Sequence, residues 1–164
     1  MNWLTRLLPT IGTSKSKSKV PDGLWNSCPA CESVLYAPEL EKSLFVCPKC
    51  DHHLRIGARK RLDMFLDGGK YKEIAADLLT KDPLKFKDTK NYTNRVKDAV
   101  AASGENEAIV IASGSLESMP IIVAAFEFRF MGGSMGGVVG EKFVKGVEEA
   151  IKTKRPFVCF STSG

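Results

Sequence analysis

The spacing of apolar residues predicts two helices in the middle of the chain. Over residues 58–66 three large apolar side chains fall on one helical face, and two glycines follow them as a stop signal. Over residues 89–102 apolar side chains again recur at helical spacing, and Gly104 ends the pattern. Both segments are therefore expected to pack one face against a core.

The pattern changes after Gly104. Residues 108–112 and 121–130 are rich in β-branched and aromatic residues, and the turn signals at 117–120 between them predict a hairpin. A helix is then predicted over 138–152, and a buried strand over 157–160. The residues expected on the buried face of that helix are Phe143, Val144, Val147 and Ile151.

This order of strand, strand, helix and strand predicts an α/β domain over residues 57–164. The sequence ends in the loop 161–164, at a point where another helix would be expected. We therefore expect a C-terminal truncation.

The first 56 residues are organised differently. Residues 1–10 predict a short amphipathic turn that Pro9 stops, and the Ser/Lys tract at 14–19 predicts a linker, so residues 1–20 are expected to form a flexible basic tail. A faint similarity to a mitochondrial presequence is the alternative. Residues 21–56 form a cysteine module in which 33–36 and 44–47 predict two short strands.

Length and composition indicate which classes of protein the chain can belong to. The chain has 164 residues, of which 43% are hydrophobic, and it can bury one ordinary core. Its longest strictly apolar run, residues 121–126, is far shorter than the roughly 20 residues that cross a membrane. No segment in the first 20 residues predicts a secretory signal, so we expect a soluble protein in the reducing cytoplasm.

The net charge of +5 is unevenly distributed, because the basic excess lies in the first 60 residues, with the cysteines. Such an excess indicates contact with nucleic acid or with cofactor phosphates, or compensation of thiolate charge on a metal.

Four of the five cysteines form the strongest motif. Cys28, Cys31, Cys47 and Cys50 follow the pattern C-x2-C-x15-C-x2-C, which is the spacing of a tetrahedral four-thiolate zinc site. Four thiolates leave no open coordination position, so the predicted role of Zn²⁺ is structural. Two disulfides and an iron–sulfur cluster are the alternatives.

Other residues near this motif receive lesser roles. His52 and His53 are expected to be exposed or to lie behind the ligands. Lys49, Arg55 and Arg59 would offset the charge of about −2 on a zinc tetrathiolate. Cys159, in an apolar strand, is expected to be a core residue.

A glycine-rich segment, residues 131–137, precedes the predicted helix at 138–152 and is called the glycine segment below. It matches neither a P-loop nor the dinucleotide-binding motif. It could present backbone N–H groups to a carbonyl, phosphate or oxyanion at a helix N-terminus, or it could only permit close packing of the helix on the sheet.

Taken together, three segments resemble one known family. They are the two CxxC motifs with the residues around them, the Asp-Pro-Leu-Lys-Phe sequence at 82–86, and the Phe-Glu-Phe-Arg-Phe-Met-Gly-Gly-Ser-Met-Gly sequence at 126–136. The chain from Pro21 onward resembles the carboxyltransferase β subunit of bacterial and plastid acetyl-CoA carboxylase.

The resemblance implies a crotonase-like (ClpP/crotonase) spiral domain after the zinc ribbon. The implied reaction transfers the carboxyl group from carboxybiotin, held on a biotin carboxyl carrier protein, to acetyl-CoA, and gives malonyl-CoA, the first committed step of fatty-acid synthesis. The implied partners are the carboxyltransferase α subunit, in an α2β2 heterotetramer, and biotin carboxylase.

Site residues also carry over from the resemblance. The four cysteines become the ligands of one structural zinc, and the implied wall of the substrate pocket is formed by Gly132, Gly133, Ser134, Gly136 and Gly137. No catalytic side chain is implied, because backbone N–H groups polarise the thioester and biotin carbonyls in the family. The family's later glycine-rich turns are absent here, so we expect this chain alone to be inactive.

Two other functions compete with this one. A zinc-ribbon nucleic-acid-binding module would explain the basic excess, although the ribbon has few aromatics and no dense arginine cluster. A redox switch would need reactive thiols, whereas metal-bound thiolates are protected from alkylation.

Overall fold

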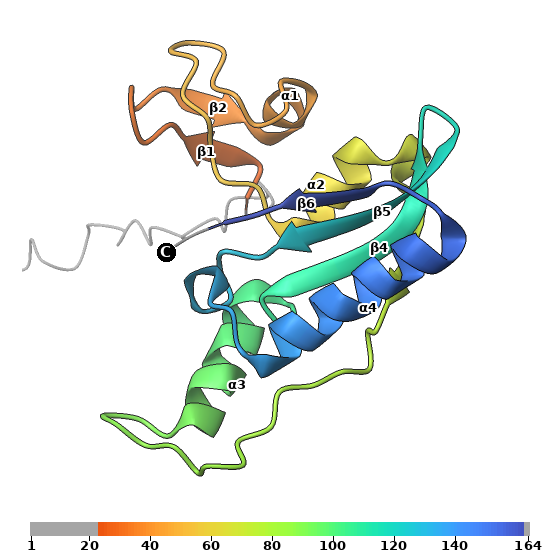
Figure 1. Ribbon diagram of the computed structural model, residues 1–164. Helices are drawn as coiled ribbons and strands as arrows, with labels where there is room; N and C mark the ends of the chain where they lie inside the picture. Colours follow the sequence, from red (N-terminus) through yellow and green to blue (C-terminus); the bar gives the residue numbers. More distant parts are fainter. Residues whose placement is uncertain (1–22, 163–164) are drawn as a thin grey trace, which may run out of the picture. The chain divides into compact units, whose positions relative to one another are not determined.

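The computed structural model describes residues 23–162, and the expected N-terminal turn, linker and basic tail lie outside these residues. The chain divides into two compact units, Met1–Leu54 and Arg55–Gly164. Each unit is described by itself below (Figure 1). No helix among the described residues is both long and apolar enough to cross a membrane.

The first unit is a small ribbon. Its strands β1 (Trp25–Ser27) and β2 (Val34–Tyr36) pair antiparallel, and the short helix α1 (Ala37–Lys42) follows β2 directly. The prediction of a strand at 33–36 is thus confirmed, whereas the strand predicted at 44–47 is wrong. Leu44 and Phe45 have φ angles of 55° and 62°, which a strand excludes, and only a single bridge joins Val46 to His53.

The second unit contains a four-stranded sheet in the order β3-β4-β5-β6. Neighbouring strands are antiparallel except for β5 and β6, which are parallel and are connected through a helix. The strands are β3 (Tyr71–Ile74), β4 (Ile109–Leu116), β5 (Met119–Phe126) and β6 (Phe157–Phe160). The predicted hairpin is confirmed, and the final strand forms at the predicted residues, although its residues are only partly buried or exposed. The strand β3 is an addition that the sequence pattern did not predict.

The hairpin between β4 and β5 turns on two residues, Glu117 and Ser118. Both have positive φ angles, 50° and 67°, as a type I′ turn requires. The backbone N–H groups of both residues donate to the carboxylate of Asp67, each at 2.8 Å. A side chain distant in sequence therefore holds this turn.

The helices of the second unit match the predicted positions closely. They are α2 (Ala58–Phe65), α3 (Tyr92–Ser103) and α4 (Gly137–Thr153), and two short 3-10 helices, η2 (Asp67–Gly69) and η3 (Met131–Gly133), lie between other elements. The helix α3 ends as predicted at Gly104, which has a left-handed φ of 78°.

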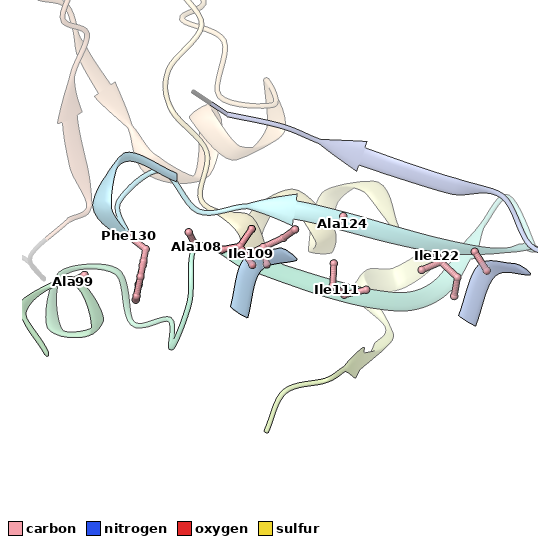
Figure 2. Close-up of a cluster of buried hydrophobic side chains, with 9 residues drawn as sticks. Ala99, Ala108, Ile109, Ile111, Ile122, Ala124 and Phe130 are labelled. Atoms are coloured by element: carbon pink, nitrogen blue, oxygen red, sulfur yellow. The ribbon is translucent and has the colours of Figure 1, made fainter. Parts of the chain in front are cut away.

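The sheet is buried on both faces. One face packs on α4, with Ala99 of α3 joining the same core, and the other face packs on α2 (Figure 1). Alternate residues of β4 serve the two cores, because Ile109 and Ile111 point to the first and Val110 and Ala112 to the second. Figure 2 shows members of the first core along β4 and β5.

The predicted buried face of α4 needs correction. Val144 and Ile151 of α4 are 52% and 73% exposed, because the helix instead buries the face that carries Val139, Gly146 and Ala150. Gly146 lets α4 approach the sheet closely, since a Cβ there would lie 2.8 Å from Ile111 Cγ2.

Cys159 is exposed rather than buried in a core, because β6 is the outer strand of the sheet in the described part of the chain. The strand predicted to reach Phe130 ends at Phe126, since residues 127–130 form a turn.

Candidate metal centre and glycine segment

The ribbon brings the four predicted cysteines together. Their sulfur atoms all lie within 4.8 Å of one another. The Sγ atoms of Cys28 and Cys50 are 3.7 Å apart, and those of Cys31 and Cys47 are 3.8 Å apart. Cys28 and Cys47 are completely buried, whereas Cys31 and Cys50 are exposed.

These distances fit a zinc ion and do not fit disulfides. Four sulfurs at about 2.3 Å from a tetrahedral centre are about 3.8 Å from each other. A disulfide needs about 2.05 Å between sulfurs, and every cysteine in the described residues is free. The four thiolates would hold Zn²⁺ with no open coordination position, so that the ion would supply structural stability.

The two CxxC motifs fold into matching knuckles. In each knuckle the carbonyl of the first cysteine accepts a backbone hydrogen bond of 2.9 Å, from Glu32 to Cys28 and from Asp51 to Cys47. Glu32 and Asp51 both have left-handed φ angles, 59° and 58°. The N–H of each first cysteine also donates to a residue just beyond its knuckle, Ser33 in one case and His52 in the other.

The metal-free thiols do not titrate alike. Hydrogen bonds from the side chain and the backbone of Ser33 lower the pKa of Cys31 to about 6. The backbone N–H of His52 acts to lower the pKa of Cys50, but the neighbouring sulfurs and burial raise it to about 12. A divalent cation would let all four sulfurs be thiolates at neutral pH.

Two of the three charged residues expected to compensate the thiolates, Arg55 and Arg59, have partners in the second unit. The guanidinium of Arg59 makes two hydrogen bonds to Glu105, at 2.7 and 2.8 Å, and a salt bridge to Glu73. Arg55 lies over the ring of Phe128, 3.9 Å from its centroid. Both arginines thus have partners within the second unit, and compensation of the thiolate charge stays a prediction.

The glycine segment joins β5 to α4. Gly132 and Gly133 lie in η3 with φ angles of 69° and 77°, so both positions favour glycine. A Cβ on Gly133 would also clash with Cγ2 of Thr162, a contact across the fold that the sequence did not indicate. This part of the segment needs its glycines for the fold itself.

The second half of the segment needs no glycine for folding. Gly136 has an ordinary φ of −83° and precedes α4 without a side-chain cap. A Cβ on Gly136 or Gly137 would meet no heavy atom within 4 Å. The structure thus leaves open space beside the first turn of α4, where the backbone N–H groups lack partners within the helix.

The comparisons with known proteins bear on both units. Residues 25–50 match the family model described as Acetyl-CoA carboxylase zinc finger domain. The resemblance inferred from the sequence is confirmed. This match favours a ribbon of the acetyl-CoA carboxylase type over a nucleic-acid-binding ribbon.

The predicted fold class, a four-cysteine zinc ribbon followed by a crotonase-like α/β domain, is confirmed by the ribbon family model and the cysteine cluster for the first part and by solved structures for the second. A structure of transcarboxylase 12S with methylmalonyl-coenzyme A and methylmalonic acid bound is 27% identical, with a TM-score of 0.51, and the match covers 67% of this chain. A second structure of transcarboxylase 12S, with hydrolysed methylmalonyl-coenzyme A, gives the same identity and a TM-score of 0.54.

A single-chain, multi-domain long-chain acyl-CoA carboxylase shares the fold at 18% identity, with a TM-score of 0.54 and coverage of 67% of this chain and 11% of that chain. The match to the first transcarboxylase 12S structure covers 19% of that chain, so the present chain spans about one-fifth of its length.

Proposed function

We propose that this chain contributes to the β-type subunit of a biotin-dependent carboxyltransferase whose acceptor is acetyl-CoA and whose product is malonyl-CoA. One combination carries the proposal, namely an acetyl-CoA carboxylase zinc finger followed by an α/β unit similar to transcarboxylase 12S. The name of the ribbon family supports acetyl-CoA as the acceptor.

In this proposal residues 21–56 form the zinc ribbon and residues 57–164 belong to the crotonase-like domain. Cys28, Cys31, Cys47 and Cys50 hold one structural zinc. The partners are a carboxyltransferase α subunit, a biotin carboxyl carrier protein and biotin carboxylase, and the setting is the cytoplasm.

The glycine segment supplies the wall of the substrate pocket, through Gly132, Gly133, Ser134, Gly136 and Gly137. Biotin on its carrier brings the carboxyl group. Gly132 and Gly133 shape the loop, and the open space at Gly136 and Gly137 lets an acyl-CoA approach the backbone. Backbone N–H groups at the first turn of α4 favour negative charge on an oxygen nearby, so no catalytic side chain is required.

Alanine substitutions at Gly136 and Gly137 test this role, because the added methyl group fits the fold. Neither Cβ would meet a neighbour, so both variants should fold. Gly137→Ala, inside α4, should leave the melting temperature unchanged or slightly higher, whereas Gly136→Ala, at the N-cap, should lower it slightly. If a substrate approaches the backbone, each variant loses carboxyl transfer in the assembled enzyme. The matched control is Gly140→Ala, one turn further along α4 and also in open space.

The assay follows biotin-dependent formation of acetyl-CoA from malonyl-CoA by the full-length protein with its partners. We expect activity to fall at least about tenfold in the Gly136 and Gly137 variants and to stay unchanged in Gly140→Ala. Wild-type rates in all three variants would show that the segment serves packing only.

A further inference from the structure

We propose that Glu127 is a positioning residue that fixes the point at which the glycine segment leaves the sheet. The inference rests on the proposed function, in which the glycine segment forms a wall of the substrate pocket. It concerns a buried carboxylate that lies just before the glycine segment and is not one of the predicted site residues. Glu127 directly follows β5 and is only 4% exposed.

Both oxygens of this carboxylate bind backbone N–H groups from separate parts of the chain. Oε2 accepts a buried hydrogen bond of 2.8 Å from the N–H of Ala58, at the start of α2. Oε1 accepts one of 2.9 Å from the N–H of Arg129, in the turn that leads to the glycine segment. No side chain at the N-cap of α2 caps this helix. Glu127, which is 69 positions from Ala58 in the sequence, accepts the N–H at its first turn instead.

Two neighbouring features tighten the same junction. A Cβ on Gly57 would lie 2.8 Å from Oε2 of Glu127, so the glycine leaves room for the carboxylate. Arg55 covers the ring of Phe128 at 3.9 Å. Residues 55–58 and 127–129 are therefore joined by one hydrogen bond, a close approach of Gly57 to the carboxylate and a cation–π contact.

The effect of Glu127 extends into the glycine segment through the backbone. The carbonyl of Glu127 accepts from the N–H of Phe130 at 3.2 Å, and the carbonyl of Phe130 accepts from the N–H of Gly133 at 2.9 Å. Phe130 is 3% exposed and belongs to the core cluster that includes Ala99 of α3 (Figure 2). The start of the segment is thus fixed on one side by the core and on the other by Glu127.

Glu127→Gln is the direct perturbation. The amide keeps one acceptor oxygen and turns a donor NH₂ toward the other N–H, so one of the two backbone bonds is lost. The fold of α2 and the sheet should persist, because their cores are unchanged. A displacement of about 1 Å in a group that positions substrate can cost roughly 100-fold in rate.

Glu105→Gln is the matched control. Glu105 is also a buried carboxylate, 7% exposed, and it also binds α2, through the guanidinium of Arg59. No hydrogen bond among the described residues joins it to the glycine segment. A change common to both variants therefore reports general loosening of α2, whereas a change confined to the Glu127 variant reports positioning of the segment.

Two measurements on the full chain decide the matter. The first is amide hydrogen exchange, in which Glu127→Gln should speed exchange at Arg129, Phe130 and Gly133 by roughly tenfold or more, with no such change in Glu105→Gln. The second is steady-state carboxyl transfer in the assembled enzyme. There we expect kcat to fall by roughly 10- to 100-fold with a smaller change in KM.

If Glu127→Gln does not fold, Gly57→Ala presses on the same carboxylate and should show the same pattern. Wild-type exchange at these amides, or equal effects in Glu105→Gln, would overturn the proposal. So would fast exchange with wild-type kcat. If the wild-type complex shows no carboxyl transfer at all, the proposed function fails, and the exchange data alone then support or overturn the anchoring by Glu127.

Discussion

Replacement of Cys47 by serine should release zinc and unfold the ribbon while the second unit stays folded. Cys47 is completely buried, and its sulfur lies 3.8 Å from that of Cys31, so it would occupy one corner of the tetrahedron. A serine hydroxyl is a poor substitute for a thiolate ligand, and three sulfurs hold the ion much more weakly.

The size of the effect follows from how little else supports the ribbon. Its fully buried core consists of Leu35 and Leu40 beside Cys28 and Cys47. Burial of two leucines contributes about 3–6 kcal/mol, whereas binding of a structural zinc contributes about 10–16 kcal/mol at pH 7. Loss of the ion therefore removes the larger contribution to the stability of the ribbon.

The assay combines elemental analysis with amide NMR. Wild-type protein should contain about one zinc per chain, and Cys47→Ser close to none. Amide signals of residues 23–54 should collapse to unfolded positions while those of the second unit persist. Cys159→Ser is the control, because Cys159 is exposed and lies outside the ribbon. Wild-type protein without zinc, or a variant that keeps zinc and a folded ribbon, would refute the reasoning.

Two further predictions concern the second unit. Gly146→Ala puts a methyl group 2.8 Å from Ile111 and should destabilise the protein by about 1–3 kcal/mol in thermal or urea unfolding, whereas the open position of Gly140 tolerates alanine; equal melting temperatures would contradict this. A hydrogen bond from Arg95 lowers the pKa of Asp88 from 3.8 to about 2. The stability that the Asp88–Arg95 pair contributes is therefore fully present above pH 3.8 and is lost as the pH falls through about 2. NMR titration of Asp88 in Arg95→Met should show the pKa returning toward 3.8, and an unchanged titration would refute the pairing.

The sequence predicted most regular elements of the second unit because local pattern decides them. The hairpin, α2, α3, α4 and β6 all lie close to their predicted positions. The predicted buried face of α4 was wrong, since close approach at Gly146 rotates the helix so that Val144 and Ile151 face solvent. Hydrophobic periodicity records residue types, and it does not record how near a helix can come to a sheet.

The ribbon was harder to predict, because the metal-binding knuckles set its backbone. Residues 44–47 have apolar side chains suited to a strand, yet left-handed φ angles at Leu44 and Phe45 turn the chain toward the second knuckle. The spacing of the cysteines did predict which four sulfurs meet, because CxxC geometry is local. Glu127 could not have been found in this way, since the atoms that it binds belong to residues far apart in the sequence.

The two-residue turn of the hairpin has a consequence for which mutations the protein can tolerate. Residues 109–112 of β4 and 121–125 of β5 are buried against apolar side chains on both faces, so a one-residue slip between the strands would still bury apolar groups. Hydrophobicity therefore gives little discrimination between registers. The register is encoded mainly in the turn at Glu117 and Ser118 and in the carboxylate of Asp67 that holds it. Conservative substitutions along these strands are compatible with the fold, whereas a single-residue insertion or deletion in the turn would exchange the two core-facing sets of side chains over the whole length of a strand.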